Sequence, residues 1–120
     1  MFVREIPGMR LVSEANQREH YMAKHQRAAR HRALGRAVVE AEFRCVPPTL
    51  PCVVTITKLG AGRVDSDNLA GSAKSLRDGI ADVLRETSGL RDDGDARVTW
   101  VVKQERAPRG THAVRVEVTW

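Results

Sequence analysis

The sequence predicts an α+β fold, in which a mixed and largely antiparallel sheet packs against two main helices. Residues 52–59 are rich in β-branched side chains, which favour strands. A long stretch over residues 17–43 has no proline, and a regular apolar stripe runs from Leu69 to Leu84. The resulting order of strand, helix, strand, helix and two strands is typical of a sheet covered by helices. With 120 residues, of which 42% are hydrophobic, we expect a single domain over residues 1–120.

The amino-terminal third is predicted to contain a short extended segment and then a long helix. Phe2, Val3 and Ile6 precede a Pro7–Gly8 turn, and residues 9–12 form a candidate strand edge. Residues 13–16 are predicted to form a turn and a helix cap. The helix over residues 17–43 has an apolar face in its second half, which we expect to pack on the sheet. That face consists of Leu34, Val38 and Ala41, with Ala33 and Ala37 beside it.

The first half of this helix is basic nearly all round. Two interpretations remain open: an ordinary solvated face, or a surface whose Arg and Lys side chains contact phosphates. The candidate DNA-binding residues are Arg18, Lys24, Arg27 and Arg30, followed by Arg32 and Arg36. The whole chain has 20 Lys and Arg against 15 Asp and Glu, a net charge of +5 and a pI near 9.9. A basic protein of this kind often has a polyanionic partner.

A strand over residues 52–59 ends at a Gly60–Gly62 break, and two carboxylates, Asp65 and Asp67, follow it. Either Asp67 or Asn68 is suited to cap the next helix, which we expect over residues 69–87. Its apolar stripe alternates spacings of four and three, which places one face of the helix in the core. The stripe consists of Leu69, Ala73, Leu76, Ile80, Val83 and Leu84.

On the side of the helix opposite this stripe, the spacing of Asp67, Lys74 and Asp78 predicts a polar face. A second acidic cluster, over residues 92–95, follows the helix closely. We expect the two clusters to meet at one site and to hold a divalent metal, because Mg²⁺ prefers carboxylate oxygens and a nearby lysine can neutralise phosphate charge. Each element also has a simpler interpretation: a helix cap, an ion pair between Lys74 and Asp78, or a turn that favours Asp and Gly.

The remaining residues predict two strands, over 97–104 and 111–120, joined by a turn into a hairpin. In the second strand Val114, Val116 and Val118 share one face. No apolar run reaches the length of a membrane span, no signal peptide is apparent, and we expect Cys45 and Cys52 to be reduced thiols. These features favour a cytoplasmic protein.

The acidic motifs as a set resemble the RusA family of Holliday-junction resolvases, and most closely its phage and prophage branch. The resemblance covers about residues 53–120. It rests on the run Asp65-Ser66-Asp67-Asn68-Leu69, on Lys74 with Asp78, and on Asp92-Asp93 ahead of a valine-rich strand. The segments 67–71 and 77–82 are similar to those of the phage branch.

The resemblance implies a homodimeric, Mg²⁺-dependent endonuclease that cuts four-way DNA junctions in recombination and repair, with Mn²⁺ as a substitute metal. It implies that Asp65, Asp67 and Asp93 are catalytic metal ligands and that Lys74 is a supporting cation. Here Lys74 follows Asp67 by seven residues, where the best-known branch has four. The loop after Asp93 is also longer, which leaves Asp92 and Asp95 as alternative ligands.

A four-way junction is close to two-fold symmetric, so a symmetric dimer would present two equivalent sites to it. Two other functions remain open: a non-catalytic protein that binds branched DNA, and a small interaction protein with no nucleic-acid role. Cleavage of a four-way junction that depends on metal separates the first function from both alternatives.

Overall fold

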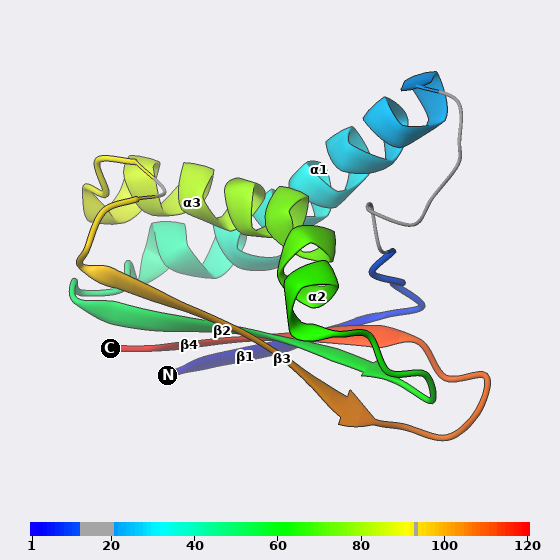
Figure 1. Cartoon of the computed structure of the whole chain (residues 1–120). Helices are drawn as coiled ribbons and strands as arrows, with labels where there is room; N and C mark the ends of the chain where they lie inside the picture. The colour runs from blue at the N-terminus through cyan, green and yellow to red at the C-terminus, as the bar shows by residue number, and fades with distance from the viewer. Residues whose placement is uncertain (13–20, 93) are drawn as a thin grey trace.

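A four-stranded sheet in the order β1-β4-β2-β3 forms the base of the molecule (Figure 1). The structure is a computed structural model that describes residues 1–12, 21–92 and 94–120. The strands are β1 (Phe2–Pro7), β2 (Cys52–Gly60), β3 (Val98–Arg106) and β4 (Ala113–Thr119). Two main helices, α1 (Tyr21–Cys45) and α3 (Lys74–Ser88), cover one face of the sheet, and the short α2 (Ser66–Ser72) joins β2 to α3. The predicted α+β class is therefore confirmed.

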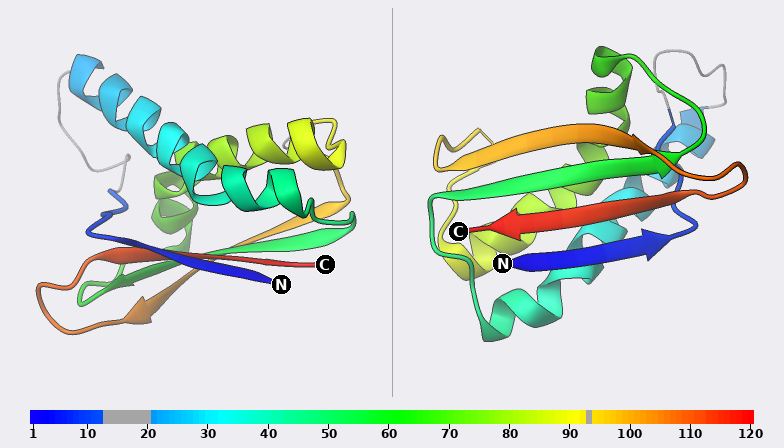
Figure 2. Two further views of the ribbon diagram at one scale, coloured as in Figure 1. Left: turned by 180° about the vertical axis from the view of Figure 1, so that it is seen from behind. Right: turned by 90° about the horizontal axis from the view of Figure 1, so that it is seen from below.

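The sheet is mixed and largely antiparallel, as predicted, but its last two strands do not form a hairpin. β4 pairs antiparallel with both β1 and β2, whereas β3 pairs parallel with the other edge of β2 (Figure 2, right). Residues 107–112 join β3 to β4 and let the chain step across the end of β2. A two-residue loop would force the flanking strands to pair, and a connection of this length does not. The prediction of a hairpin is wrong for this reason.

The core lies between the sheet and the helices. Val54 and Ile56 of β2 are fully buried, and so are the three valines that share one face of β4. The predicted apolar stripe is buried along its whole length, from Leu69 at 4% exposure to Leu84 at 0%. Residues 9–12 form no strand, but Met9 and Leu11 are buried in the same core.

The predicted helix over residues 69–87 is divided into α2 and α3 at Ala73. Ala73 caps both helices; its N–H donates to Ala70 O at 3.3 Å, and its carbonyl accepts from the Arg77 N–H at 3.0 Å. Ser72 Oγ donates to Leu69 O at 2.7 Å, one of the local side-chain bonds that compete with regular helix geometry. The apolar stripe survives the break, whereas Asp67 and Lys74 come to lie on different helices.

α1 and α3 contact each other through two glycines. A Cβ atom at Gly35 would lie 2.3 Å from Leu76 O, and one at Gly79 would lie 2.0 Å from Arg32 O. The buried residues of α1 are His31, Gly35, Val39 and Phe43, so the predicted apolar face is wrong except at Val38, which is half-buried and packs against the core. Leu34 is 37% exposed, because the close approach at Gly35 turns the adjacent face of α1 toward the core.

Candidate functional site

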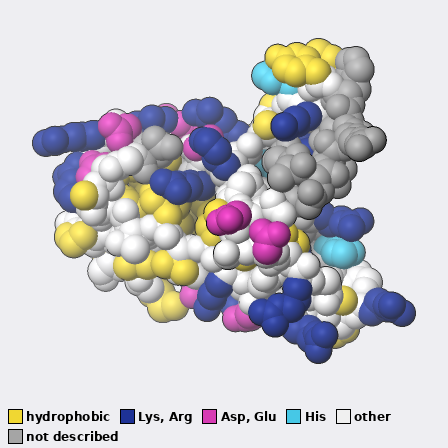
Figure 3. Space-filling view, in the orientation of Figure 1, with side chains coloured by type: hydrophobic (Ala, Val, Ile, Leu, Met, Phe, Trp, Pro, Cys, Tyr) yellow, Lys and Arg dark blue, Asp and Glu magenta, His cyan; other side chains and the backbone are white. Residues whose placement is uncertain are grey.

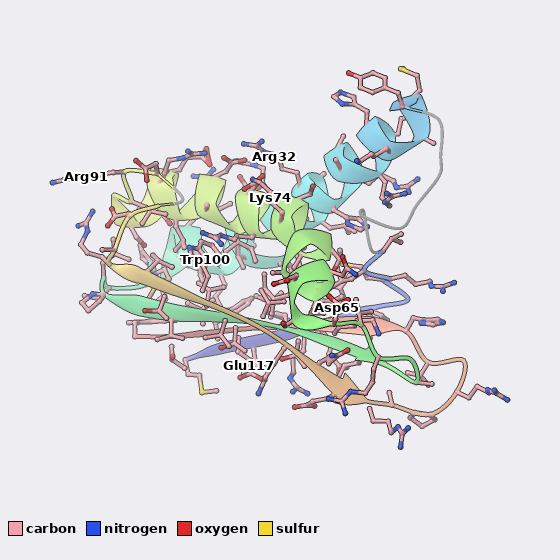
Figure 4. The ribbon with its side chains drawn as sticks, in the orientation of Figure 1. Arg32, Asp65, Lys74, Arg91, Trp100 and Glu117 are labelled. Carbon is pink, nitrogen blue, oxygen red and sulfur yellow. The ribbon has the colours of Figure 1, made fainter. Side chains whose placement is uncertain are left out.

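The first acidic cluster lies where the chain leaves β2 and enters α2 (Figure 4). Asp65 is the N-cap of α2: its Oδ1 accepts from the Asn68 N–H and its Oδ2 from Asn68 Nδ2, both at 3.0 Å. The cap is therefore Asp65 rather than Asp67 or Asn68. An ionised carboxylate offers about four lone-pair positions, so these two bonds leave Asp65 able to bind a cation. Asp67 is exposed in the first turn of the same helix.

Gln104 of β3 holds the backbone immediately before Asp65. Its Oε1 accepts from the Val64 N–H at 3.0 Å, and its Nε2 donates to Val64 O at 2.7 Å. This pair of bonds fixes the position of the loop that carries Asp65. Sequence reasoning missed this residue. The sequence indicates it only weakly: Gln104 is a polar residue that follows Val98, Trp100 and Val102 at a spacing of two, and all four share one face of β3.

Lys74 lies at the opposite end of α2 from Asp65 (Figure 4). Seven helical residues span about 10 Å along the axis. Lys74 Nζ pairs with Asp78 Oδ2 at 3.1 Å, and both side chains line a separate pocket that also includes Arg32. The ion-pair interpretation of Lys74 and Asp78 is therefore confirmed, and the structure does not bring Lys74 to the acidic pair.

In the second acidic cluster, Asp95 organises the loop that leads into β3. Its carboxylate accepts two bonds from the Arg97 side chain, at 3.1 and 2.8 Å, and one each from the Arg97 and Arg91 N–H groups, at 3.0 and 3.1 Å. The Arg97 guanidinium holds the pKa of Asp95 well below its usual range. Four bonds occupy the lone pairs of this carboxylate, which argues against Asp95 as a metal ligand. Asp92 accepts from the Gly94 N–H at 2.8 Å, and Asp93 lies outside the described residues.

The two acidic clusters do not meet within one chain, as far as the described acids Asp92 and Asp95 show. Val64 is bonded to Gln104 near the end of β3, whereas Arg97, just before β3, accepts from the Cys52 N–H. Seven strand residues separate these two anchors by about 23 Å. The expectation that the clusters converge is wrong for these residues, because α3 and the length of β3 lie between them (Figure 1). Among the described residues, no group of three His, Cys, Asp or Glu side chains could hold a metal ion.

The basic residues of α1 divide into two groups. Arg32 Nε pairs with Asp82 Oδ2 at 2.8 Å, and Arg36 Nη1 pairs with Glu86 Oε2 at 2.8 Å, so both arginines bind acids of α3. The hydrogen bond from Arg32 lowers the pKa of Asp82. Of the candidate DNA-binding residues, Lys24 and Arg30 are exposed, Arg27 is half-buried and Arg18 lies outside the described residues.

A cleft of about 540 Å³ lies beside the acidic pair, between residues 9–12, the end of β2 and the loop that leads to Asp65. No acid is present among the described residues that line it. Figure 3 shows Lys and Arg side chains gathered at this end of the molecule, next to a small acidic patch. Sequence reasoning missed the cleft, because its lining residues come from distant segments. Its basic side chains are Arg10, Arg27, Lys58, Arg63 and His112.

A comparison with models of known protein families finds no match to this chain. A comparison with curated proteins also finds no match. Within the described part of the chain, no helix is both long enough and apolar enough to cross a membrane.

Proposed function

We propose that this protein is a Mg²⁺-dependent endonuclease that resolves four-way DNA junctions, and that it acts as a cytoplasmic homodimer. The observation that carries the proposal is the position of two exposed carboxylates, Asp65 and Asp67, beside a cleft whose charged side chains are all basic in the described part. Basic side chains attract DNA phosphates, and neighbouring carboxylates attract a hard divalent cation. The similarity of the acidic motifs to the RusA family supports the same conclusion.

The chemistry of the donor groups supports a magnesium or manganese ion at this site. Asp65 keeps free lone pairs beside its capping bonds, and Asp67 offers a second hard oxygen donor on the same turn. Bound Mg²⁺ supplies a more acidic water and a Lewis acid for a phosphate oxygen. Arg63 and Lys58 are the cations best placed to hold the phosphate, because they line the adjacent cleft whereas Lys74 is paired with Asp78.

A second copy of the chain is the natural source of the third carboxylate, Asp93. Its described neighbour Asp92 belongs to the loop before β3, and the strand separates Arg97 at the end of that loop from Gln104 beside Val64 by about 23 Å. A two-fold dimer can place this loop of one copy beside α2 of the other, which creates two equivalent composite sites. Two such sites would make the paired nicks that junction resolution requires.

The direct test measures cleavage of a four-way junction, a fork and a linear duplex, with and without Mg²⁺. We expect the four-way junction to be cleaved when Mg²⁺ is present and to stay intact when it is absent. Asp67→Asn should abolish cleavage while junction binding persists, because one metal ligand is lost and one negative charge is removed from the DNA site. Asp78→Asn is the matched control, since Asp78 pairs with Lys74 away from the cleft. Normal cleavage by correctly folded Asp67→Asn protein contradicts the proposal.

Mixing two inactive variants tests whether the site is composite. In a mixed dimer of Asp67→Asn and Asp93→Asn chains, a composite arrangement leaves one site with all its carboxylates. Nicking of a single strand should then return on mixing. If each site belongs to one chain, both sites of the mixed dimer carry a substitution and no nicking returns.

The second candidate is a protein that binds branched DNA without cutting it. The observation that favours it is that Asp65 already has a structural role as a helix cap, and that Lys74 is already paired. Salt-sensitive junction binding without cleavage under any divalent metal would support this alternative.

A further inference from the structure

The basic cleft has an apolar side that DNA phosphates alone would not use. The half-buried Leu59 and Val64 line the cleft, together with Met9 and Leu11, which are only 6% exposed and form a minor part of its surface. The charged side chains lie in the same cleft, and Lys58 Nζ is held there by a bond to Gly62 O at 3.0 Å. The cleft therefore presents cationic and apolar surface to the same ligand.

A nucleotide with an unstacked base has this combination of surfaces. Its phosphate is anionic, and its base is a flat and largely apolar ring that gains by leaving water. A base-paired duplex instead exposes phosphates and keeps its bases stacked inside, so it would leave the apolar side of the cleft in contact with water. The volume of about 540 Å³ lies within the range of roughly 300–1,000 Å³ typical of ligand pockets.

We infer that this cleft binds an unpaired nucleotide of a DNA strand, with its base against Leu59 and Val64 and its phosphate near Arg10 and Arg63. Arg10 and Arg63 are exposed, and within the described part of the chain neither forms an ion pair. Val64 directly precedes Asp65, so a nucleotide in the cleft lies next to the acidic pair. This inference rests on the proposed function in one respect. If the acidic pair cleaves DNA, a cleft that binds an unpaired nucleotide beside it explains why the nuclease would select DNA with unpaired positions.

The experiment measures binding without metal, so that cleavage plays no part. The probes are a labelled twelve-residue oligothymidylate, an abasic sugar–phosphate oligomer of the same length, and a blunt duplex, each titrated in EDTA. The wild-type chain should bind oligothymidylate about fivefold more tightly than the abasic oligomer, from the removal of base surface from water. Leu59→Asn, which keeps the shape of the side chain, should remove this preference. The control Leu34→Asn, at a residue of α1 that is 37% exposed, should keep it.

Two arginine variants test the phosphate side of the cleft. Arg10→Gln and Arg63→Gln, made singly, should each weaken oligothymidylate binding several-fold and reduce the salt slope by about 0.7, the value for one lost contact with single-stranded DNA. Arg91→Gln is the matched control, because Arg91 is an exposed arginine in the loop before β3, at the other end of the molecule (Figure 4). Its affinity and salt slope should equal those of the wild type.

The outcomes separate this inference from the proposed function. Equal affinity for oligothymidylate and the abasic oligomer overturns the inference, and so does an unchanged salt slope in both arginine variants. Competition by a phosphorylated peptide of equal charge, as strong as that of oligothymidylate, also overturns it in favour of a general anion site. Binding in the expected pattern without cleavage in Mg²⁺ overturns the nuclease proposal alone, whereas junction cleavage without these preferences overturns the cleft inference alone.

Discussion

Two regions of the molecule differ in whether their arginines have acidic partners: the crossing of α1 and α3, and the cleft at the end of β2. At the crossing, Arg32 and Arg36 bind Asp82 and Glu86, so each positive charge has a partner on the facing helix. At the cleft, Arg10 and Arg63 are exposed without an ion pair among the described residues. The number of basic residues in a segment therefore does not identify a binding surface. What matters is whether the tertiary structure supplies acids to neutralise them.

The two regions also differ in how closely the backbone packs. At the crossing, Gly35 and Gly79 let two helices approach until no Cβ atom fits. In the cleft, Gly62 has nothing within 4 Å of an added Cβ, and the same is true of Gly71 near the end of α2. A substitution that is severe in the first region should therefore be mild in the second.

The largest expected effect comes from Gly79→Ala. Its new methyl group would lie 2.0 Å from Arg32 O, which is backbone and cannot move without shifting α1. We expect a loss of about 3 kcal/mol or more in unfolding free energy by urea denaturation. Gly71→Ala is the matched control in a helix, and it should stabilise by about 0.5 kcal/mol, because the helix has room for the methyl group. Equal stability of the two variants would contradict the close crossing.

A substitution at Gln104 tests the rigidity of the acidic pair. Gln104→Met keeps the length of the side chain but loses both bonds to Val64. The Mg²⁺ concentration for half-maximal cleavage should rise by about 10- to 100-fold, the usual effect of removing a group that orients a metal ligand. Stability alone would not raise the metal requirement, so a normal requirement in folded protein would assign Gln104 a purely structural role.

Paired substitutions on α1 sharpen the contrast between its two groups of arginines. Arg27→Gln with Arg30→Gln should weaken junction binding about tenfold and flatten its salt slope by about 0.9 per lost phosphate contact. Arg32→Gln with Arg36→Gln should leave binding nearly unchanged and lower stability instead, since these side chains bind acids of α3. Titrations at several salt concentrations distinguish the two results. Normal binding by the Arg27 and Arg30 variant, with weakened binding by the Arg32 and Arg36 variant, would refute this assignment of the two groups.

Asp65 allows the structural and chemical roles of one carboxylate to be separated. Asp65→Ala removes the cap of α2 and should cost about 1 kcal/mol, whereas Asp65→Asn keeps a good capping side chain and should cost little. Both variants should lose cleavage under the proposed function. Thermal melts and cleavage assays on the same samples test this, and an active Asp65→Asn protein would leave Asp65 as a cap alone.

The smallest effect concerns acid stability at the helix crossing. The hydrogen bond from Arg32 lowers the pKa of Asp82 below its ordinary value of 3.8. This pair therefore stabilises the fold above about pH 4, and its contribution is lost as the pH falls through the lower folded-state pKa. Arg32 is half exposed, so we expect no more than about 1 kcal/mol. Asp82→Asn should flatten the decline of melting temperature between pH 5 and pH 2, measured against the wild type.

Part of the fold could be predicted from local pattern. The stripe from Leu69 to Leu84 identified the buried face of α2 and α3 even though the helix breaks at Ala73, because its period of 3.6 residues persists on both sides of the break. The alternating valines of β4 identified its core face in the same way. The pairing of β3 with β2 could not be predicted, because a six-residue connection is compatible with either neighbour.

The sequence by itself determined the long helix α1, the strands β2, β3 and β4, which faces of α3 and β4 enter the core, and where two carboxylates follow β2. These properties depend on residues close together in the chain. Only the tertiary structure decided that Gly35 and Gly79 meet, that Arg32 pairs with Asp82, and that the described acids of the second cluster, Asp92 and Asp95, lie far from the first. It also placed residues 9–12 beside the end of β2 to form the cleft. Contacts between distant segments depend on how the elements pack, and no local period in the sequence records that packing.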